Sequence, residues 1–199
     1  MSTQLSDSID EFELQRRLDA FCRLTEVTQT LAAEVDTERI LSAIVNAACE
    51  ALDCERASLY LYDAETNELY TSVVTELEIS EIRKSIDFGV SGWVARTREL
   101  ANVPDPPSDP NWNSQFDEAT GFRTRNILAA PLIAPHGGAL MGVLQLLNKR
   151  DGSFARYDED LLRAFCHHAA AALDRAKLVE QIRQQKEICL LYTSPSPRD

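Results

Sequence analysis

Apolar side chains in the first quarter of the chain recur every three or four residues, the spacing of one helix face. Ser8 and Glu11 form a capping box that opens a helix predicted to run to about residue 31. Asp36 is placed to cap a second helix that includes residues 40–52. The buried faces of the two helices are predicted to comprise Leu14, Leu18, Phe21, Leu24, Val27 and Leu31, then Ile40, Leu41, Ile44, Val45, Ala48 and Leu52.

After residue 56 the pattern changes to short runs rich in β-branched and aromatic residues, which are typical of strands. We predict strands over residues 57–62, 68–75 and 83–88, with a turn at 63–67. A Gly-Val-Ser-Gly turn at 89–92 then leads into a short helix at 93–97. This turn is either an ordinary strand-to-helix connection or, through the free amides of the helix N-terminus, a site for an anion.

Two nearly uninterrupted apolar runs, residues 126–133 and 139–147, flank a turn at 135–138. This arrangement predicts an antiparallel hairpin. A strand shows an unbroken apolar run when both of its faces are covered, so both strands are expected in the middle of a sheet with helices on at least one side.

Residues 102–114 hold four prolines and are predicted to be a loop rather than a helix or a central strand. A loop of this length in a compact domain is usually functional, and here it would form the wall or lid of a pocket. Trp112 and Phe116 are expected to anchor it, with ligand contact as the alternative role.

From Asp158 a mixed three-and-four spacing predicts a helix to about Lys186. This helix is longer than one small domain can cover, so its end is expected to continue as a coiled coil in a parallel homodimer. The period stops at Ile188, and the Ser-Pro repeat of residues 188–199 resembles a non-native tail after a truncated reading frame.

The composition restricts the possible partners. The net charge of −12 argues against nucleic acid and against an anionic membrane surface, since both would repel the chain. No apolar run approaches the roughly 20 residues of a membrane span, and the polar N-terminus lacks the features of a signal peptide. We therefore expect a cytoplasmic location.

The pattern offers no nucleophile–base pair, P-loop or metal cluster, so we predict no catalytic site, no metal and no cofactor. Cys22, Cys49 and Cys166 lie among apolar residues of predicted helices, where a cysteine usually acts as a small buried hydrophobe. Cys166 precedes His167, but this pair lies away from the expected pocket loops.

One motif is more specific: Asn148-Lys149, a short loop, Phe154, then Asp158-Glu159. Together with Thr120 to Thr124 (Thr-Gly-Phe-Arg-Thr) and Gly142 to Gln145 (Gly-Val-Leu-Gln), it resembles the regulatory GAF domains of cyclic-nucleotide phosphodiesterases and some adenylyl cyclases. The resemblance covers about residues 36–178.

The resemblance implies a set of ligand contacts. Residues 90 and 91 match the position where backbone amides meet a cyclic phosphate, and Thr120 and Thr124 match threonines on the phosphate and ribose side. Ser58 and Gln145 match polar positions near the base, and residue 113 matches a position on the lid. The implied ligand-binding residues are Ser58, Val90, Ser91, Asn113, Thr120, Thr124 and Gln145.

The motif residues are expected to frame the pocket rather than touch ligand. By resemblance, Lys149 and Asp158 form a salt bridge that joins the last strand to the last helix. Asn148 and Glu159 would cap this junction, and Phe154 would plug it. An exposed salt bridge contributes only about 0–1 kcal/mol, so the motif matters for stability if the junction is buried.

We therefore predict an α+β domain of the GAF fold, with about six antiparallel strands, helices on one face and a loop-covered pocket on the other. The expected organisation is a dimerisation helix at 1–35, the domain at 36–178, a coiled-coil linker at 179–187 and the tail at 188–199. The expected function is sensing cGMP or cAMP and signalling through the terminal helices to a missing output domain. The alternatives are a ligand-free dimerisation scaffold, a sensor of another small molecule, and an enzyme or chromophore protein on the same fold.

Overall fold

The computed structural model describes residues 36–74 and 83–193. The helix predicted from Ser8 lies outside these residues. The elements in chain order are α2 (Thr37–Ala51), β1 (Cys54–Asp63), β2 (Glu68–Val74), β3 (Arg83–Ser85), α3 (Gly89–Thr97), β4 (Ala101–Val103), the 3-10 turn η1 (Pro106–Ser108), α4 (Gln115–Thr120), β5 (Ile127–Ile133), β6 (Leu140–Lys149) and α5 (Arg156–Thr193).

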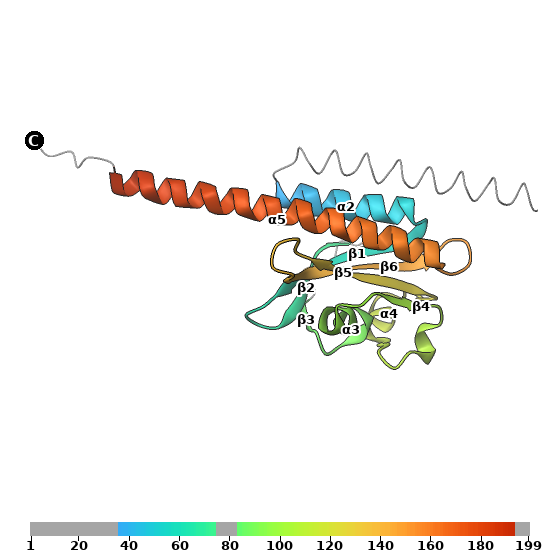
Figure 1. Cartoon of the computed structure of the whole chain (residues 1–199). Helices are drawn as coiled ribbons and strands as arrows, with labels where there is room; N and C mark the ends of the chain where they lie inside the picture. Colours follow the sequence, from blue (N-terminus) through green and yellow to red (C-terminus); the bar gives the residue numbers. More distant parts are fainter. Residues whose placement is uncertain (1–35, 75–82, 194–199) are drawn as a thin grey trace, which may run out of the picture.

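The strands form one sheet in the order β3-β2-β1-β6-β5-β4, and every neighbouring pair is antiparallel. The predicted hairpin is β5 with β6, and both strands lie inside the sheet as their apolar runs indicated. Helices α2 and α5 cover one face, while α3, α4 and the loops around them lie on the other (Figure 1). The predicted fold class, an α+β domain with six strands, is confirmed.

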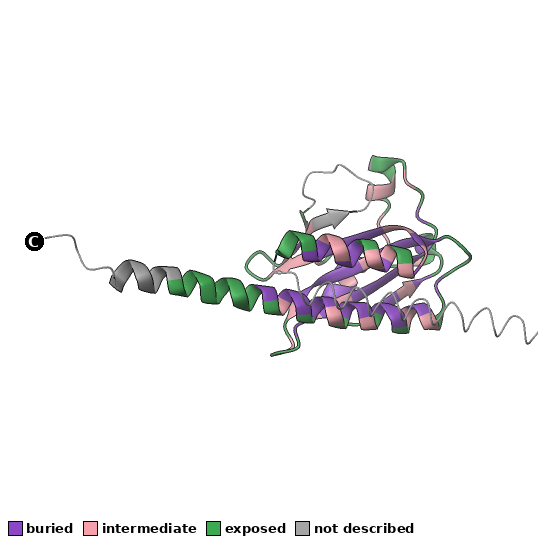
Figure 2. Ribbon diagram, turned by 90° about the horizontal axis from the view of Figure 1, so that it is seen from above, coloured by how far each residue is buried: buried purple, intermediate pink, exposed green. Residues whose placement is uncertain are grey.

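The helix-covered face carries the larger hydrophobic core. The Asp36 carboxylate starts α2 by accepting hydrogen bonds from the amides of Glu38 (2.9 Å) and Arg39 (3.2 Å), as predicted. The apolar face of α2 and the inner half of α5 then pack on the sheet, and Figure 2 shows buried residues along both helices where they lie over the strands. The fully buried large side chains include Ile40, Leu41, Ile44, Leu52, Leu59, Leu128, Leu132, Leu144, Leu146 and Leu162.

Three sequence predictions need correction. The strand expected at 83–88 ends at Ser85, after which Phe88 donates its amide to the Ser85 carbonyl in a turn. Residues 89–92 are the first turn of α3 rather than a turn before it. The segment 102–114 is not all loop, because it contains the end of β4 and the 3-10 turn η1.

The last helix also differs from the prediction. Although the apolar period ends at Ile188, α5 continues to Thr193 because the backbone after Lys186 contains no proline before Pro195. Leu178, Val179 and Ile182 are large apolar side chains exposed on the part of α5 that extends past the sheet (Figure 2). The inner half of the helix therefore belongs to the domain, and its outer half does not.

Candidate ligand-binding site

The sheet face opposite α2 and α5 forms the floor of a cavity. Side chains alternate along a strand, so Ser58 and Tyr60 of β1 point to this face together. Ser58 is paired directly with Gln145 of β6, and Ile127 of β5 is paired with Leu147 of β6. These residues line the cavity. The floor thus has a polar centre flanked by aromatic and aliphatic side chains.

The wall is the start of α3. Gly92 lets this helix approach the backbone of Ile86 closely, because a Cβ at this position would overlap the Ile86 carbonyl group. Arg96 also donates a hydrogen bond to that carbonyl. The result is that Val90 and Ser91, in the first turn of α3, line the cavity. Amides in the first turn of a helix have no partner inside the helix.

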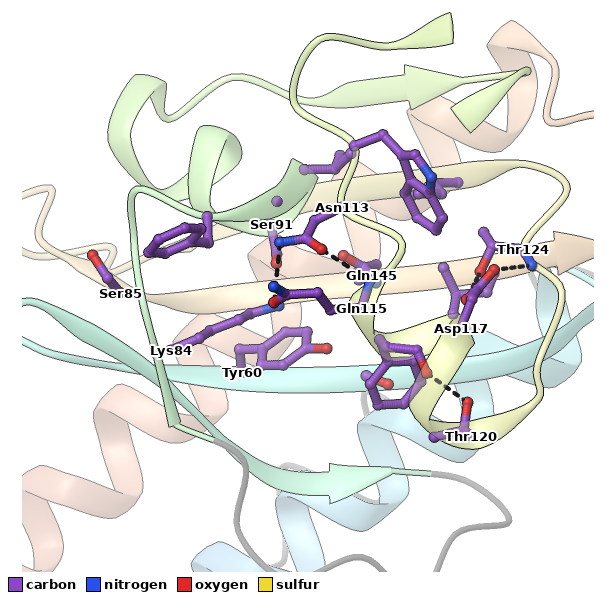
Figure 3. A pocket seen from close by; sticks show the side chains of 18 of the residues that line it. Tyr60, Lys84, Ser85, Ser91, Asn113, Gln115, Asp117, Thr120, Thr124 and Gln145 are labelled. Atoms are coloured by element: carbon purple, nitrogen blue, oxygen red, sulfur yellow. Dashed lines mark hydrogen bonds between the residues drawn. The ribbon is translucent and has the colours of Figure 1, made fainter. Parts of the chain in front are cut away.

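Ser91 carries an unusual polar atom. The residue is 1% exposed, and no group in the described part of the chain forms a hydrogen bond with its hydroxyl oxygen. A buried hydroxyl without a partner costs free energy, about 1–3 kcal/mol. Since Ser91 borders the cavity (Figure 3), a ligand with a polar group at this wall would supply the missing hydrogen bond.

The lid consists of the segment from Trp112 through α4. Asp117 of α4 holds it to the start of β5, because its carboxylate accepts hydrogen bonds from both the amide and the hydroxyl of Thr124, each at 2.7 Å (Figure 3). At the other end of α4, Asn113 Oδ1 accepts from the Gln115 amide at 2.9 Å. Trp112 packs on the apolar cluster of this face. It anchors the lid as predicted and also lines the cavity, as Phe116 does.

Two cationic side chains lie at the rim on β3. Arg83 is held by Asp63 (3.2 Å) and Glu68 (3.5 Å). Lys84 instead lies with its ammonium 4.0 Å from the centre of the Tyr60 ring. A cation over an aromatic face is attracted by the ring's negative potential. Lys84 thus brings positive charge to the cavity lining.

The cavity measures about 680 Å³, within the range of roughly 300–1,000 Å³ typical of small-molecule sites. The cavity lies where β1, α3, the lid, β5 and β6 come together. All seven residues expected to contact the ligand line it, namely Ser58, Val90, Ser91, Asn113, Thr120, Thr124 and Gln145. The hydroxyls of the two threonines are, however, engaged within the protein. Thr120 donates to the Phe116 carbonyl (2.8 Å), and Thr124 donates to Asp117.

The sequence reasoning did not single out several other lining residues, among them Tyr60, Lys84 and Asp117. Tyr60 could have been found, since it follows Ser58 by two residues in the same strand and must share its face. Lys84 and Asp117 lie on a three-residue strand and a six-residue helix, which are too short to give a periodic signal.

The frame around the cavity is built on the motif at 148–159, and none of the five motif residues lines the cavity. Lys149 Nζ lies 2.7 Å from Asp158 Oδ1, as predicted, and both residues are buried. Lys149 also donates to the Leu52 carbonyl (3.1 Å), while Asp158 accepts from the Ala155 amide (2.8 Å). Phe154 is 5% exposed and fills the junction as expected.

Asn148 and Glu159 have roles other than the predicted caps of this junction. Asn148 has a positive φ of 59° and holds the segment before β5, accepting from the Arg125 amide (2.6 Å) and donating to the Arg123 carbonyl (2.9 Å). Glu159 accepts a hydrogen bond from Asn102 Nδ2 (2.9 Å), which joins α5 to β4. The Asn148 side chain therefore holds the segment before β5, and the Glu159 side chain holds β4.

The hydrogen bonds of Glu55 predict that the stability of the fold at this frame depends on pH. Hydrogen bonds from Arg125 (2.7 Å) and Asn148 (2.8 Å) lower the pKa of its carboxyl below the ordinary value of 4.5. A carboxyl with a lowered folded-state pKa stabilises the fold above its unfolded-state pKa, and this contribution is lost as the pH falls through the folded-state value. Between about pH 5 and pH 3, the urea midpoint of the wild type should fall more steeply than that of Glu55→Gln. Equal slopes would contradict this assignment.

Within residues 36–74 and 83–193, no cluster of three or more His, Cys, Asp or Glu side chains is arranged to hold a metal ion. None of the helices in this same part of the chain combines the length and apolar character needed to cross a membrane. Cys54 and Cys166 belong to the core on the helix-covered face, away from the cavity, whereas Cys49, expected to be buried, is half-buried and packs against this core.

Six antiparallel strands with two helices on one face and a ligand-sized cavity on the other define an α+β domain with a candidate ligand site. The family model described as "GAF domain" matches residues 36–173. The chain therefore belongs to the GAF domain family.

Two relatives from animals extend this result. The chain is 31% identical to a probable 3',5'-cyclic phosphodiesterase of Caenorhabditis elegans, over 87% of this chain and 25% of that protein. It is 27% identical to a dual 3',5'-cyclic-AMP and -GMP phosphodiesterase of Drosophila melanogaster, over 83% of this chain and 12% of that protein. The chain thus spans a quarter or less of the length of these relatives.

Solved structures agree with the fold. The GAF domain of a phosphoenolpyruvate-protein phosphotransferase from Coxiella burnetii aligns with a TM-score of 0.74 at 24% identity, covering 83% of this chain and 98% of that domain. A free methionine-R-sulfoxide reductase from Neisseria meningitidis aligns with a TM-score of 0.66 at 18% identity, covering 78% of this chain and 89% of that one. At these identities the likeness concerns the fold alone.

Proposed function

We propose that this domain is a regulatory sensor whose cavity binds a purine 3',5'-cyclic monophosphate, cGMP or cAMP. The observation that carries the proposal is the buried Ser91 hydroxyl, which has no hydrogen-bond partner among the described residues and lies in the first turn of α3 at the cavity wall. A cyclic phosphate placed there would accept hydrogen bonds from this hydroxyl and from the first-turn amides, in the favourable field of the helix dipole.

The rest of the lining suits the same ligand. Lys84 brings a positive charge that favours an anion. Tyr60, Trp112 and Phe116 offer aromatic surface for a purine ring. Gln145 and Ser58, paired across β6 and β1, offer both donors and acceptors to the edge of a base without selecting guanine or adenine. The two animal relatives, a probable 3',5'-cyclic phosphodiesterase and a dual 3',5'-cyclic-AMP and -GMP phosphodiesterase, also support this ligand class.

Isothermal titration of the purified chain with cGMP and then with cAMP tests the proposal. We expect saturable binding of at least one nucleotide and an affinity loss of roughly 10- to 100-fold in Ser91→Ala, because a hydrogen bond to a charged group contributes about 1.5–3 kcal/mol. Ser153→Ala removes an exposed hydroxyl outside the cavity and should bind like the wild type. A folded wild type that binds neither nucleotide would favour the scaffold or a different small ligand.

We further propose that occupancy is signalled through α5 and that α5 pairs with the same helix of a second copy. Leu178 and Ile182 are spaced by four residues and, with Val179, expose apolar surface on the part of α5 beyond the sheet. Two helices bury such a stripe by packing against each other. In a longer protein of the phosphodiesterase kind, this helix pair would connect the sensor to an enzyme domain.

A further inference from the structure

Two cysteines meet where α2 ends and β1 begins. Cys49 lies in the last turns of α2 and Cys54 is the first residue of β1. Both are thiols, and their sulfur atoms lie 3.4 Å apart, with the Cys54 S–H donating to Cys49 Sγ. The Cys49 S–H in turn donates to the Cys54 carbonyl at 3.2 Å. The pair is spanned by only the short turn at 52–53, so its two sulfurs stay adjacent as long as α2 and β1 are folded.

The two thiols differ in access. Cys54 is 1% exposed and belongs to the core, whereas Cys49 is only half-buried. The hydrogen bond with Cys49, together with burial, raises the pKa of the Cys54 thiol well above its ordinary value. Cys49 is therefore the thiol suited to react first with a reagent from solution.

We propose that Cys49 and Cys54 form a redox-modification site at which a low-molecular-weight disulfide creates an intrachain disulfide. In the first step, the Cys49 thiolate attacks one sulfur of the reagent, whose S–S bond breaks and releases one thiolate. In the second step, Cys54 loses its proton and attacks the Cys49 sulfur, which expels the second half of the reagent as a thiolate. The protein loses two hydrogens and two electrons, and the reagent becomes two thiols.

The geometry is favourable for the second step. A disulfide has an S–S length of about 2.05 Å, so the sulfurs must approach by only ~1.4 Å from their present contact. Lys149 is the strand partner of Cys54 on β6. Lys149 also donates to the carbonyl of Leu52 inside the turn that joins the two cysteines. The site therefore borders the buried frame on the face opposite the cavity.

The test uses the full chain with Cys22→Ser and Cys189→Ser, so that the remaining thiols are the three that the structure describes. The native protein is incubated with glutathione disulfide, alkylated and digested with trypsin, which cleaves after Arg39 and Arg56. Peptide 40–56 contains both cysteines. We expect it to become two hydrogens lighter and to lose both alkylation sites, while Cys166, buried alone in the core, keeps its thiol.

Single variants establish the order of the steps. Cys54→Ser should accumulate a mixed disulfide on Cys49, because no second thiol is left to displace glutathione. Cys49→Ser should leave Cys54 unmodified, because that sulfur is buried. A bridge that forms only in denaturant, or equal modification of the two single variants while circular dichroism reports native structure, would overturn the proposal. If a variant does not fold, the result with peptide 40–56 from the protein that retains both thiols still decides it.

Discussion

Replacing Asp158 with alanine should lower the free energy of unfolding by about 3–5 kcal/mol, because it leaves the ammonium of Lys149 buried without its counter-ion. Lys149 and Asp158 are 8% and 6% exposed, and their ion pair is 2.7 Å long. The loss also removes the acceptor of the Ala155 amide at the entry to α5. Urea unfolding followed by circular dichroism measures the change.

Two further variants distinguish the cost of leaving a buried charge unpaired from the cost of losing an ion pair as such. Arg183→Ala breaks a pair with Glu180 of similar length, but on the exposed part of α5, and should leave the urea midpoint nearly unchanged. Lys149→Met combined with Asp158→Ala should recover part of the lost stability, because no uncompensated charge remains. An Asp158→Ala protein within about 1 kcal/mol of the wild type would show that the junction is not stabilised by this pair.

Replacing Asp117 with alanine should release the lid. The carboxylate accepts both the amide and the hydroxyl of Thr124 at 2.7 Å, and hydrogen bonds to a charged group contribute about 1.5–3 kcal/mol each. We expect hydrogen exchange of the Thr124 amide to accelerate by roughly 10- to 100-fold, because this amide loses its acceptor. Nucleotide affinity should fall as well, because Asp117, Phe116 and Thr120 of α4 line the cavity.

The exchange measurement needs no ligand and so tests the lid independently of the proposed function. Glu118→Ala is the matched control, since Glu118 is the exposed neighbour of Asp117 in the same helix and bonds only to Ser114 among the contacts described. Asp117→Asn should give an intermediate rate, because the amide oxygen still accepts one hydrogen bond. Unchanged exchange at Thr124 in Asp117→Ala would mean that another contact holds the lid closed.

Elements with a long apolar period were predictable from the sequence. The β5–β6 hairpin and the caps and faces of α2 follow from runs that are long enough for one periodicity to dominate. The seven implied ligand contacts converge on one cavity because each was placed by a motif and not by a period. Whether they bind the ligand remains a prediction.

What the sequence did not predict depends on contacts between side chains or on very short elements. Helix α4 has six residues and is held by the Asp117–Thr124 contact, which no local pattern encodes. The pairing of Asn148 with Arg123 and Arg125 joins segments more than twenty residues apart. The contact of Cys49 with Cys54 arises from a tight turn, and the five-residue spacing alone does not distinguish it from two separate buried thiols.

The attachment of α5 has a mechanical consequence. The buried ion pair between Asp158 and Lys149 attaches the start of α5 to β6. From Asp158 the helix continues for 35 residues to Thr193, a length of about 52 Å at 1.5 Å per residue. A tilt of the helix by about 5° at this attachment would displace its far end by roughly 4–5 Å, provided the helix stays straight. Gln145 on the cavity floor is only four residues from Lys149 along the same strand. The domain can thus act as a lever in which a small movement of one strand is amplified at a distance.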